Sequence, residues 1–455
     1  MPGGLAFAQI VRHHFFVIPF ESMEAPSLRS PESIAHAPVV APAAWGTLAL
    51  LSLVNAVNYT DRMALAVLVE PIKQDLALSD TQIGLLTGVA FALFYSLLGV
   101  PIARYADRAN RTRLISVTLT FWSVMAALGG AAQNFFHLFL SRIGVGAGEA
   151  GCIPASHSLI ADLFPRERRP LALSLFNIGA MVGIMAGLGA AGWLAAHYGW
   201  RLTLVLTALP GLLLVPFVFM LREPPRGALD GADAPAPLAL RAAIRTLLGR
   251  RSFPPLALAT ALISFAAIGI AQWTPAFMMR SHAMNLEEVG AAYSLANGIA
   301  SILGLLLGGW LLDRYRHRDP RWSLWISAGA IALTCPLTIA ALLIDGMMPM
   351  IVLLTLSALI GNIPAGPLVA SIQSVTHPRA RALASAVTAL GVSLLAFGVG
   401  PLAVGAASDA LTATRGADAL RYALVAISFT YLGGIGLMIW AAAHLRADLA
   451  KAAAD

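Results

Sequence analysis

The chain alternates between long apolar segments and short polar ones, and this pattern predicts membrane helices. A helix that spans a bilayer needs about 20 mostly apolar residues. Segments of roughly that length, separated by charged or Pro- and Gly-rich breaks, occur at 44–70, 80–106, 113–133, 135–163, 170–196, 201–221, 253–279, 287–312, 322–344, 348–376, 380–408 and 420–444. The predicted fold class is therefore an all-α membrane protein with twelve transmembrane helices.

The composition excludes other classes. The 455 residues are 58% hydrophobic and only 12% charged, whereas soluble domains carry about 25% charged residues. A soluble multidomain enzyme and a disordered chain are thereby excluded. The two cysteines, Cys152 and Cys335, lie in apolar runs far apart, so we expect packing roles and no disulfide or metal site.

The distribution of positive charge predicts the orientation. With a cytoplasmic N-terminus, 23 of the 30 Lys and Arg fall in cytoplasmic segments and five in outer loops. Because cytoplasmic loops are enriched in Lys and Arg, we expect a multi-pass protein of the cell's inner (plasma) membrane with both termini cytoplasmic. The net charge of +7 then needs no nucleic-acid partner.

Polar stretches predict the domain organisation. We expect a cytoplasmic tail, two six-helix bundles joined by a cytoplasmic linker, and a short C-terminal tail, at 1–43, 44–221, 222–252, 253–446 and 447–455. The second half of the linker, from Leu238 to Arg251, is predicted to form a short basic helix on the membrane surface.

The two bundles share signals that indicate an internal repeat. Capping boxes open at Ser79 and at Asn285, 206 residues later. Charged turns end the same helices, Asp107-Arg108 in the first half and Asp313-Arg314 in the second, again 206 residues apart. Two parallel six-helix repeats are typical of the major facilitator superfamily.

Four motifs carry a closer resemblance. They are Asn58-Tyr59-Thr60-Asp61-Arg62, VGAGEA at 145–150, LIADLF at 159–164 and LREPPRG at 221–227. Together they resemble the spinster branch of the superfamily, whose animal members export sphingosine phosphate and lysophospholipids. The chain departs from the superfamily's charged turn at Ala103 and Asn110, where glycines are usual.

Asp61, Arg62, Arg142 and Glu149 lie inside predicted spans. A charge at the bilayer centre costs about 3 kcal/mol on insertion scales, so such residues are functional candidates. Glu149 lies midway along its span, about 21 Å from either surface at the helical rise. Arg142 precedes it by two turns, which places both on one side. The alternative is a static ion pair that joins helix 1 to helix 4.

The resemblance implies that helices 1, 4, 7 and 10 line a central cavity that holds these charges. We expect Asp61 and Glu149 to couple protons and the arginines to bind an anion bidentately. The full set of expected substrate-binding residues is Arg62, Arg142, Asn55, Tyr59, Gln272, Trp273 and Asn362. Asp107, Arg108, Asp313 and Arg314 are expected to gate the cytoplasmic side.

The resulting hypothesis is a secondary active transporter that moves an anionic amphipathic lipid by proton-linked alternating access. The alternative is a proton-coupled symporter of a small organic anion. His157 and Asp162 have an acyltransferase-like spacing, but no second acyltransferase element, Walker loop, metal cluster or nucleophile elbow accompanies it. We therefore expect no enzymatic activity, catalytic residue, cofactor or metal, and a monomer whose partners are protons and the substrate.

Overall fold

The computed structural model describes residues 41–227, 240–377 and 380–454. Within these ranges the chain forms helices and turns and no strand, which confirms the all-α class. Most of the predicted tail 1–43 and residues 228–239 of the linker lie outside the described residues.

The first half of the chain supplies six spans. The first four are α2 (Pro42–Asp75), then α3 (Asp80–Gly84) with the π-helical η2 (Leu85–Val89) and α4 (Ala90–Ala106), then α5 (Arg111–Gly129), then α6 (Phe135–Glu149) with α7 (Cys152–Leu163). The fifth and sixth spans form the continuous α8 (Arg169–Phe219), which turns at Gly199, whose φ of 77° favours glycine. The short α9 (Leu240–Leu248) follows in the linker, where a short helix was predicted.

The second half of the chain also supplies six spans. It contains α10 (Phe253–His282), α11 (Leu286–Tyr315), α12 (Trp322–Leu343), α13 (Met347–Gly361) with α14 (Ala365–Ser374), then α15 (Arg381–Gly391) with the π-helical η4 (Val392–Val399) and α16 (Gly400–Arg415). After the 3-10 turn η5 (Gly416–Asp418), α17 (Ala419–Ser428) and α18 (Thr430–Ala454) form the last span.

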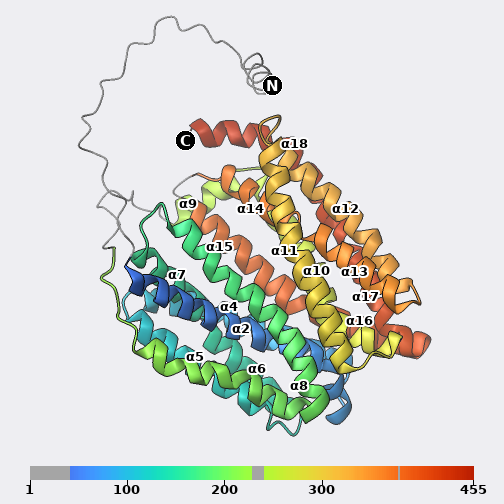
Figure 1. The fold of residues 1–455 in the computed structure, drawn as a ribbon. Helices are drawn as coiled ribbons and strands as arrows, with labels where there is room; N and C mark the ends of the chain where they lie inside the picture. Colours follow the sequence, from blue (N-terminus) through green and yellow to red (C-terminus); the bar gives the residue numbers. More distant parts are fainter. Residues whose placement is uncertain (1–40, 228–239, 378–379, 455) are drawn as a thin grey trace, which may run out of the picture. The chain divides into compact units, whose positions relative to one another are not determined.

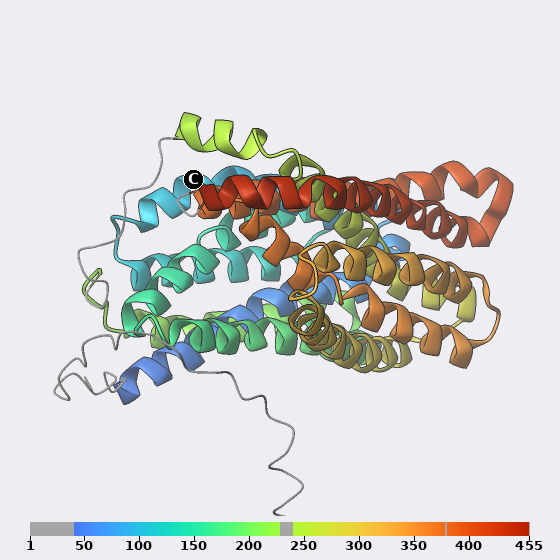
Figure 2. The ribbon, with the colours of Figure 1, turned by 90° about the horizontal axis from the view of Figure 1, so that it is seen from above.

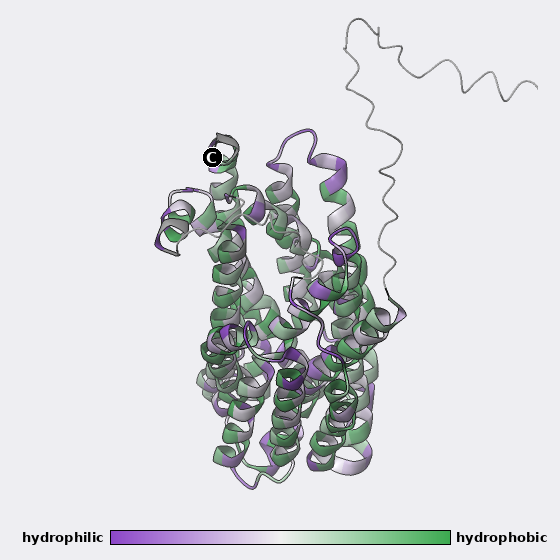
Figure 3. Ribbon diagram, turned by 90° about the vertical axis from the view of Figure 1, so that its left-hand side faces the viewer, coloured by the Kyte–Doolittle hydropathy of each residue, from purple (hydrophilic) through white to green (hydrophobic). Residues whose placement is uncertain are grey.

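Eight continuous helical stretches of the described chain are long and apolar enough to cross a membrane. Two of them, Arg169–Phe219 and Leu383–Ala452, contain a turn and cross twice. The remaining two spans, α2 and α6 with α7, carry the buried charges and so fall below a purely apolar criterion. Twelve spans therefore exist in the described residues, within a few residues of the predicted positions except at two C-terminal ends. Figure 3 shows the long helices hydrophobic over most of their length.

Local sequence signals begin several of these helices. Ser79 and Asn285 form the two predicted capping boxes, with Gln82 and Glu288 as the reciprocal partners. Each cap satisfies backbone N–H groups that a helix start leaves unpaired.

Helices of the two halves separate in space. In Figure 1 the helices from α2 to α8 gather at the lower left and those from α10 to α18 lie mostly to the upper right, and Figure 2 shows the same separation of colours. The loops after α2, α5, α10, α12 and α16 lie at one end, which we call the α2–α3 end. The opposite end carries the turn between α4 and α5. The domain bounds at 44–221 and 253–446 stay a prediction.

Glycines allow the closest helix contacts. Gly179, Gly183 and Gly187 on α8 pack directly on backbone carbonyls of α2, at Ser52, Ala56 and Thr60. Any side chain would overlap those carbonyls, so this glycine series permits the close packing of α8 on α2. Thr60 Oγ1 donates to Gly183 O at 3.2 Å across the same contact.

The two halves meet mainly toward the α2–α3 end. Gly84 lies against Pro401 and Leu402 of α16, and Gly88 lies against the carbonyl of Gly398 in η4. Both halves use a π-helical segment at this contact. Farther along α4, Ser96 and Ser393 form a hydroxyl–hydroxyl hydrogen bond of 2.8 Å.

The helices α16 and α18 extend beyond the predicted spans. The last span continues to Ala454, through the predicted tail from 447. This segment is rich in Ala, the best helix former. Asp448 is buried and accepts from Ser252 N and Ser252 Oγ, both at 2.7 Å. The tail is therefore part of the fold, for a reason that an apolar-run criterion does not detect.

Candidate functional site

A cavity of about 170 Å³ lies between the two halves. Its first-half lining comes from α2, η2, α4, α6 and α8, and its second-half lining comes from α10, α11, η4 and α16. The lining residues are Tyr59, Arg62, Met63, Thr87, Phe91, Arg142, Ile184, Leu188, Ile268, Ala271, Gln272, Tyr293, Asn297, Phe397 and Pro401. Of the expected helices 1, 4, 7 and 10, the first three contribute; the tenth does not appear among these residues.

Arg62 and Glu149 form the principal ion pair of this region. Arg62 Nε lies 2.6 Å from Glu149 Oε2, and Glu149 is fully buried. The guanidinium also lies 4.6 Å from the ring centre of Phe91 and 5.0 Å from that of Tyr95. The aromatic faces and the carboxylate together stabilise a positive charge away from water.

Arg142 and Asp61 are close neighbours without a direct bond. Both line a second, smaller cavity of about 10 Å³ inside the first half. Asp61 is 4% exposed, and neither of its carboxylate oxygens has a hydrogen-bond partner among the described residues. Arg142 lines the central cavity as well, and no carboxylate within 4 Å pairs with it in the described parts of the chain. The structure thus brings the four predicted charges together, in two unequal pairs.

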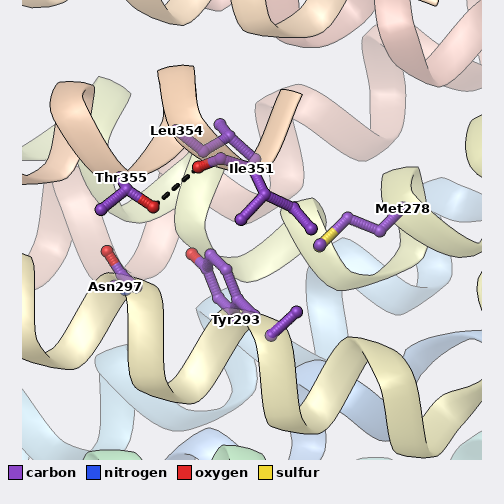
Figure 4. A pocket seen from close by; sticks show the side chains of 7 residues that line it. Met278, Tyr293, Asn297, Ile351, Leu354 and Thr355 are labelled. Carbon is purple, nitrogen blue, oxygen red and sulfur yellow. Dashed lines mark hydrogen bonds between the residues drawn. The ribbon is translucent and has the colours of Figure 1, made fainter. Parts of the chain in front are cut away.

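A small apolar pocket adjoins the central cavity on the second-half side. Tyr293 and Asn297 line both spaces. Figure 4 shows these two side chains of α11 directed toward Ile351, Leu354 and Thr355 of α13. Tyr293 Oη donates to Ala271 O at 3.3 Å, which fixes the ring between the two spaces.

The remaining residues predicted to bind substrate fall into two groups, those that line the cavity and those that do not. Tyr59 and Gln272 line the central cavity. Asn55 instead donates to Phe176 O of α8 at 3.1 Å. Trp273 is fully buried and donates to Pro401 O at 2.9 Å. Asn362 donates to Ser301 Oγ at 3.1 Å. These last three side chains bond to neighbouring helices and are not part of the cavity lining.

An ionic cluster joins the two halves at the α2–α3 end. Asp80 of α3 accepts from both terminal guanidinium nitrogens of Arg280 (2.8 and 2.9 Å), from Lys73 Nζ (2.5 Å) and from Ser408 Oγ (2.6 Å). Asp409 of α16 in turn accepts from the backbone N–H groups of Asp80 (3.0 Å) and Thr81 (2.7 Å). Sequence reasoning missed this cluster because it treated these residues only as loop charges and a helix cap.

A second charged cluster lies at the opposite end, within the first half. Arg111 is fully buried and binds Asp162, Glu223 (2.6 Å) and Ser158 (2.9 Å). Arg111 is therefore part of a buried charged cluster at this end of the first half. Asp162 of the LIADLF motif and Glu223 of LREPPRG are its partners, so these two motifs hold the linker entry to the bundle.

The charged turns are exposed at this end. Asp107 and Arg108 are exposed after α4, and Asp313 and Arg314 are exposed in the last turn of α11. Asp313 pairs only loosely with Arg316, at 3.5 Å. Their gating role stays a prediction. Among the residues with described placement, no group of three His, Cys, Asp or Glu side chains could hold a metal ion.

A family model described as Major Facilitator Superfamily matches residues 51–401. The chain belongs to the major facilitator superfamily. An MFS-type efflux pump of Mycolicibacterium smegmatis is 37% identical over 90% of this chain and 95% of its own length. Protein spinster homolog 1 of Xenopus laevis is 27% identical over 89% of this chain and 81% of its own.

Solved structures of superfamily members have the same fold as this chain. A bacterial homolog of the human lysosomal transporter spinster, titled as inward-facing and unoccupied, superposes with a TM-score of 0.82 at 29% identity, covering 90% of this chain and 98% of that one. The occupied form of that homolog gives a TM-score of 0.76. This superfamily member is a multi-pass membrane transporter of the spinster type and not an enzyme. The resemblance inferred from the motifs is confirmed.

Proposed function

We propose that this transporter moves an anionic amphipathic molecule, a lysophospholipid or a sphingosine-phosphate-like lipid, across the membrane by proton-linked alternating access. The observation that carries the proposal is one cavity in which two guanidinium groups stand opposite an apolar wall. An amphipath has the complementary chemistry, because its anionic head pairs with arginine and its hydrocarbon part gains from leaving water.

Arg142 supports the anion assignment. Glu149 neutralises Arg62, whereas Arg142 has no carboxylate within salt-bridge distance in the described chain. The positive charge of Arg142 is therefore available to a ligand in the central cavity. Tyr59 and Gln272, which line the same cavity, add polar contacts.

The apolar pocket beside Tyr293 supports a hydrocarbon portion. Met278, Ile351 and Leu354 line it, and it shares Tyr293 and Asn297 with the central cavity. A ligand whose head lies near Arg142 would extend its chain toward this side of the second half.

Proton linkage follows from the buried carboxylates. The Glu149 carboxylate neutralises Arg62 and so keeps this arginine from pairing with an anionic ligand. If Glu149 takes up a proton, Arg62 becomes free to bind the anion, so protonation and substrate binding are energetically linked. Asp61 provides a second buried carboxylate near Arg142.

The ionic cluster supports an inward-facing state. It closes the α2–α3 end, which is the outer end in the orientation predicted from Lys and Arg. The matched bacterial homolog is titled as inward-facing. We place the protein in a bacterial inner membrane as a monomer with both termini cytoplasmic. In the alternate, outward-open state, Asp107 and Asp313 close the cytoplasmic end.

The size of the cavity favours the second candidate, a proton-coupled symporter of a small organic anion. At about 170 Å³ it is smaller than common drug-sized ligand sites of about 300–1,000 Å³. The two candidates differ in whether the apolar pocket opens to accept a chain.

Purified protein in liposomes distinguishes them. Uptake of lysophospholipids and of small organic acids is compared under an imposed pH gradient. Faster movement of the lysophospholipid, lost when Met278→Gln makes the pocket polar, supports the lipid proposal. Transport of the organic acids alone supports the alternative. No gradient-dependent movement of either class contradicts both.

A further inference from the structure

Asp61 does not line the central cavity. Its neighbour Arg62 does, but Asp61 faces the small cavity inside the first half together with Ser141, Arg142 and Thr207. Both carboxylate oxygens are buried without a hydrogen-bond partner in the described structure. A space of about 10 Å³ is near the minimum for one water molecule.

Arg142 separates the two spaces. It is the residue that lines both the central cavity and the small one. A fixed guanidinium repels an excess proton in a site of low dielectric constant. A proton that reaches Asp61 from the central cavity would have to pass this positive charge.

Two hydroxyl side chains, Ser141 and Thr207, also line the small cavity. Ser141 Oγ donates to Met125 O at 2.7 Å and Thr207 Oγ1 donates to Leu204 O at 3.2 Å. Since each hydroxyl hydrogen is engaged with a carbonyl, the oxygen lone pairs remain able to accept from a water molecule. Such a water can direct its second hydrogen toward Asp61.

Ser141 also borders a larger, mostly apolar groove of about 510 Å³ between α5 and α6, and His137 is the other polar residue that lines this groove. His137 lies in the first turn of α6, whose start is capped by Asn134. This turn is at the α2–α3 end of the molecule. Ser141 thus lines both the small cavity beside Asp61 and the groove that the exposed His137 also lines.

We propose that Asp61 exchanges its proton through this side passage, with Ser141 and Thr207 as positioning residues for a relaying water, and not through the central cavity. The inference rests on the proposed function, in which Asp61 is a proton site. In the transfer, a hydronium gives one proton to the relaying water, which passes one of its own to an Asp61 oxygen; the reverse sequence returns it. No bond to carbon changes.

The passage separates the proton from the substrate. The charged or titratable groups near Asp61 are Arg142 and Glu149 on α6 and Arg62 on α2 itself, and the indole of Trp122 on α5 lies beside it. Arg62 and Arg142 line the central cavity, whereas Ser141, which lines the small cavity with Thr207, also borders the groove. Asp61 therefore communicates with the end that the ionic cluster closes to substrate.

The test uses full-length protein in liposomes that contain a pH-sensitive dye, with lysophosphatidylglycerol as the probe and small organic acids as a second probe. Thr207→Val removes a side-passage hydroxyl, and Thr87→Val is the matched control, because Thr87 lines the central cavity and donates to Ile83 O at 3.0 Å. We expect Thr207→Val to slow proton movement at least tenfold and to leave probe exchange without a pH gradient unchanged. We expect Thr87→Val to leave the proton rate unchanged, because it removes no side-passage hydroxyl, and Thr207→Ser to restore the proton rate.

If Thr207→Val fails to fold, the proton rate of Ser141→Ala provides a second test of the side passage. The side passage is overturned if Thr87→Val slows proton movement and the side-passage variants do not, or if all three leave it unchanged. Asp61→Asn separates this failure from that of the proposed function. Normal proton-linked transport by Asp61→Asn contradicts the proposed function itself. Loss of proton linkage in Asp61→Asn with normal Thr207→Val and Ser141→Ala rejects only the passage.

Discussion

Glu149 is the residue on which the energetics of the site depend. Its carboxylate lies 2.6 Å from Arg62 in a fully buried position. Removing one partner of a buried pair leaves an unbalanced charge, at a cost of about 3–5 kcal/mol. The pair is thus able to resist a change of state until a proton or an anion replaces one of its members.

Glu149→Gln is therefore expected to abolish the pH dependence of transport, because glutamine retains the shape but can neither ionise nor release Arg62 in a pH-dependent way. Initial uptake rates in liposomes from pH 5 to 8 give the measurement. Glu287→Gln, an exposed substitution in the first turn of α11, is the control. A normal pH profile for Glu149→Gln would remove this residue from the coupling.

Arg142→Gln is expected to raise the apparent KM for an anionic probe about tenfold or more, since a hydrogen bond to a charged group contributes roughly 1.5–3 kcal/mol. Binding is measured directly by titration of the purified protein with lysophosphatidylglycerol. Arg113→Gln, at an exposed position, should leave the affinity unchanged. Equal affinities for Arg142→Gln and wild type would show that the anion binds elsewhere.

The residue types of the site could be predicted from the sequence, but not the directions of all side chains. Charges within apolar runs identified Asp61, Arg62, Arg142 and Glu149. Successive helical residues are rotated by about 100°, so Asp61 faces the bundle interior while Arg62 faces the cavity. The same rotation turns Trp273 away from the cavity that Gln272 lines. Without known helix orientations, neither difference could be derived.

At the scale of elements, the contact of α8 with α2 depends on the absence of side chains. Gly183→Ala is expected to lower the thermal stability of the detergent-purified protein by several degrees, because the new methyl group overlaps Ala56 O and overpacking costs about 1–3 kcal/mol. Gly99→Ala on α4 meets no atom within 4 Å and should be neutral or slightly stabilising. Equal melting temperatures for Gly183→Ala and wild type would contradict the packing argument.

The ionic cluster between α3, α10 and α16 is expected to hold the α2–α3 end closed. Asp80→Asn leaves Lys73 without its carboxylate partner and weakens the contacts of Arg280, so the open state of this end gains population. Spin labels at the exposed positions Ala131 and Met348 should show a longer distance population in Asp80→Asn than in wild type. Asp345→Asn, whose carboxylate is 93% exposed and 3.7 Å from Arg421, is the control. An unchanged distance distribution in Asp80→Asn would contradict the role of the cluster.

The turn between α11 and α12 should not contribute to pH dependence near neutrality. The backbone N–H of Arg321 and the guanidinium groups of Arg446 and Arg321 lower the pKa of Asp319 to about 2. A carboxylate with a lowered pKa stabilises the fold above its ordinary pKa and loses that effect only as the pH falls toward 2. We expect Asp319→Asn to leave the shape of the transport profile between pH 5 and 8 unchanged, and a shifted midpoint would contradict this assignment.

The elements themselves were largely predictable. Apolar length defined the twelve spans, and capping boxes located the starts of α3 and α11. The ends of α16 and α18 were not predictable, because their last turns are polar. In α18, Asp448 forms a buried contact with Ser252 that an apolar pattern does not report. The π-helical segments were not predicted either, and they meet where Gly88 and Gly398 approach closely.

At the scale of the whole molecule, the two halves are repeats with different tasks in this account. The first half supplies the charged groups around Glu149, and the second supplies the apolar pocket beside Tyr293. Which end is closed depends on small differences between two packed states, and single-sequence patterns do not report such differences. The ionic cluster and the exposed turns at Asp107 and Asp313 become informative only in three dimensions.

The central claim is that protonation of the buried carboxylates and binding of the anion are linked. Isothermal titration of the purified protein with lysophosphatidylglycerol, in buffers of different ionisation enthalpy at one pH, counts the protons exchanged on binding. The account predicts a non-zero proton count for wild type that falls toward zero in Glu149→Gln. Tight binding with no proton exchanged in wild type at any pH from 5 to 8 would contradict it.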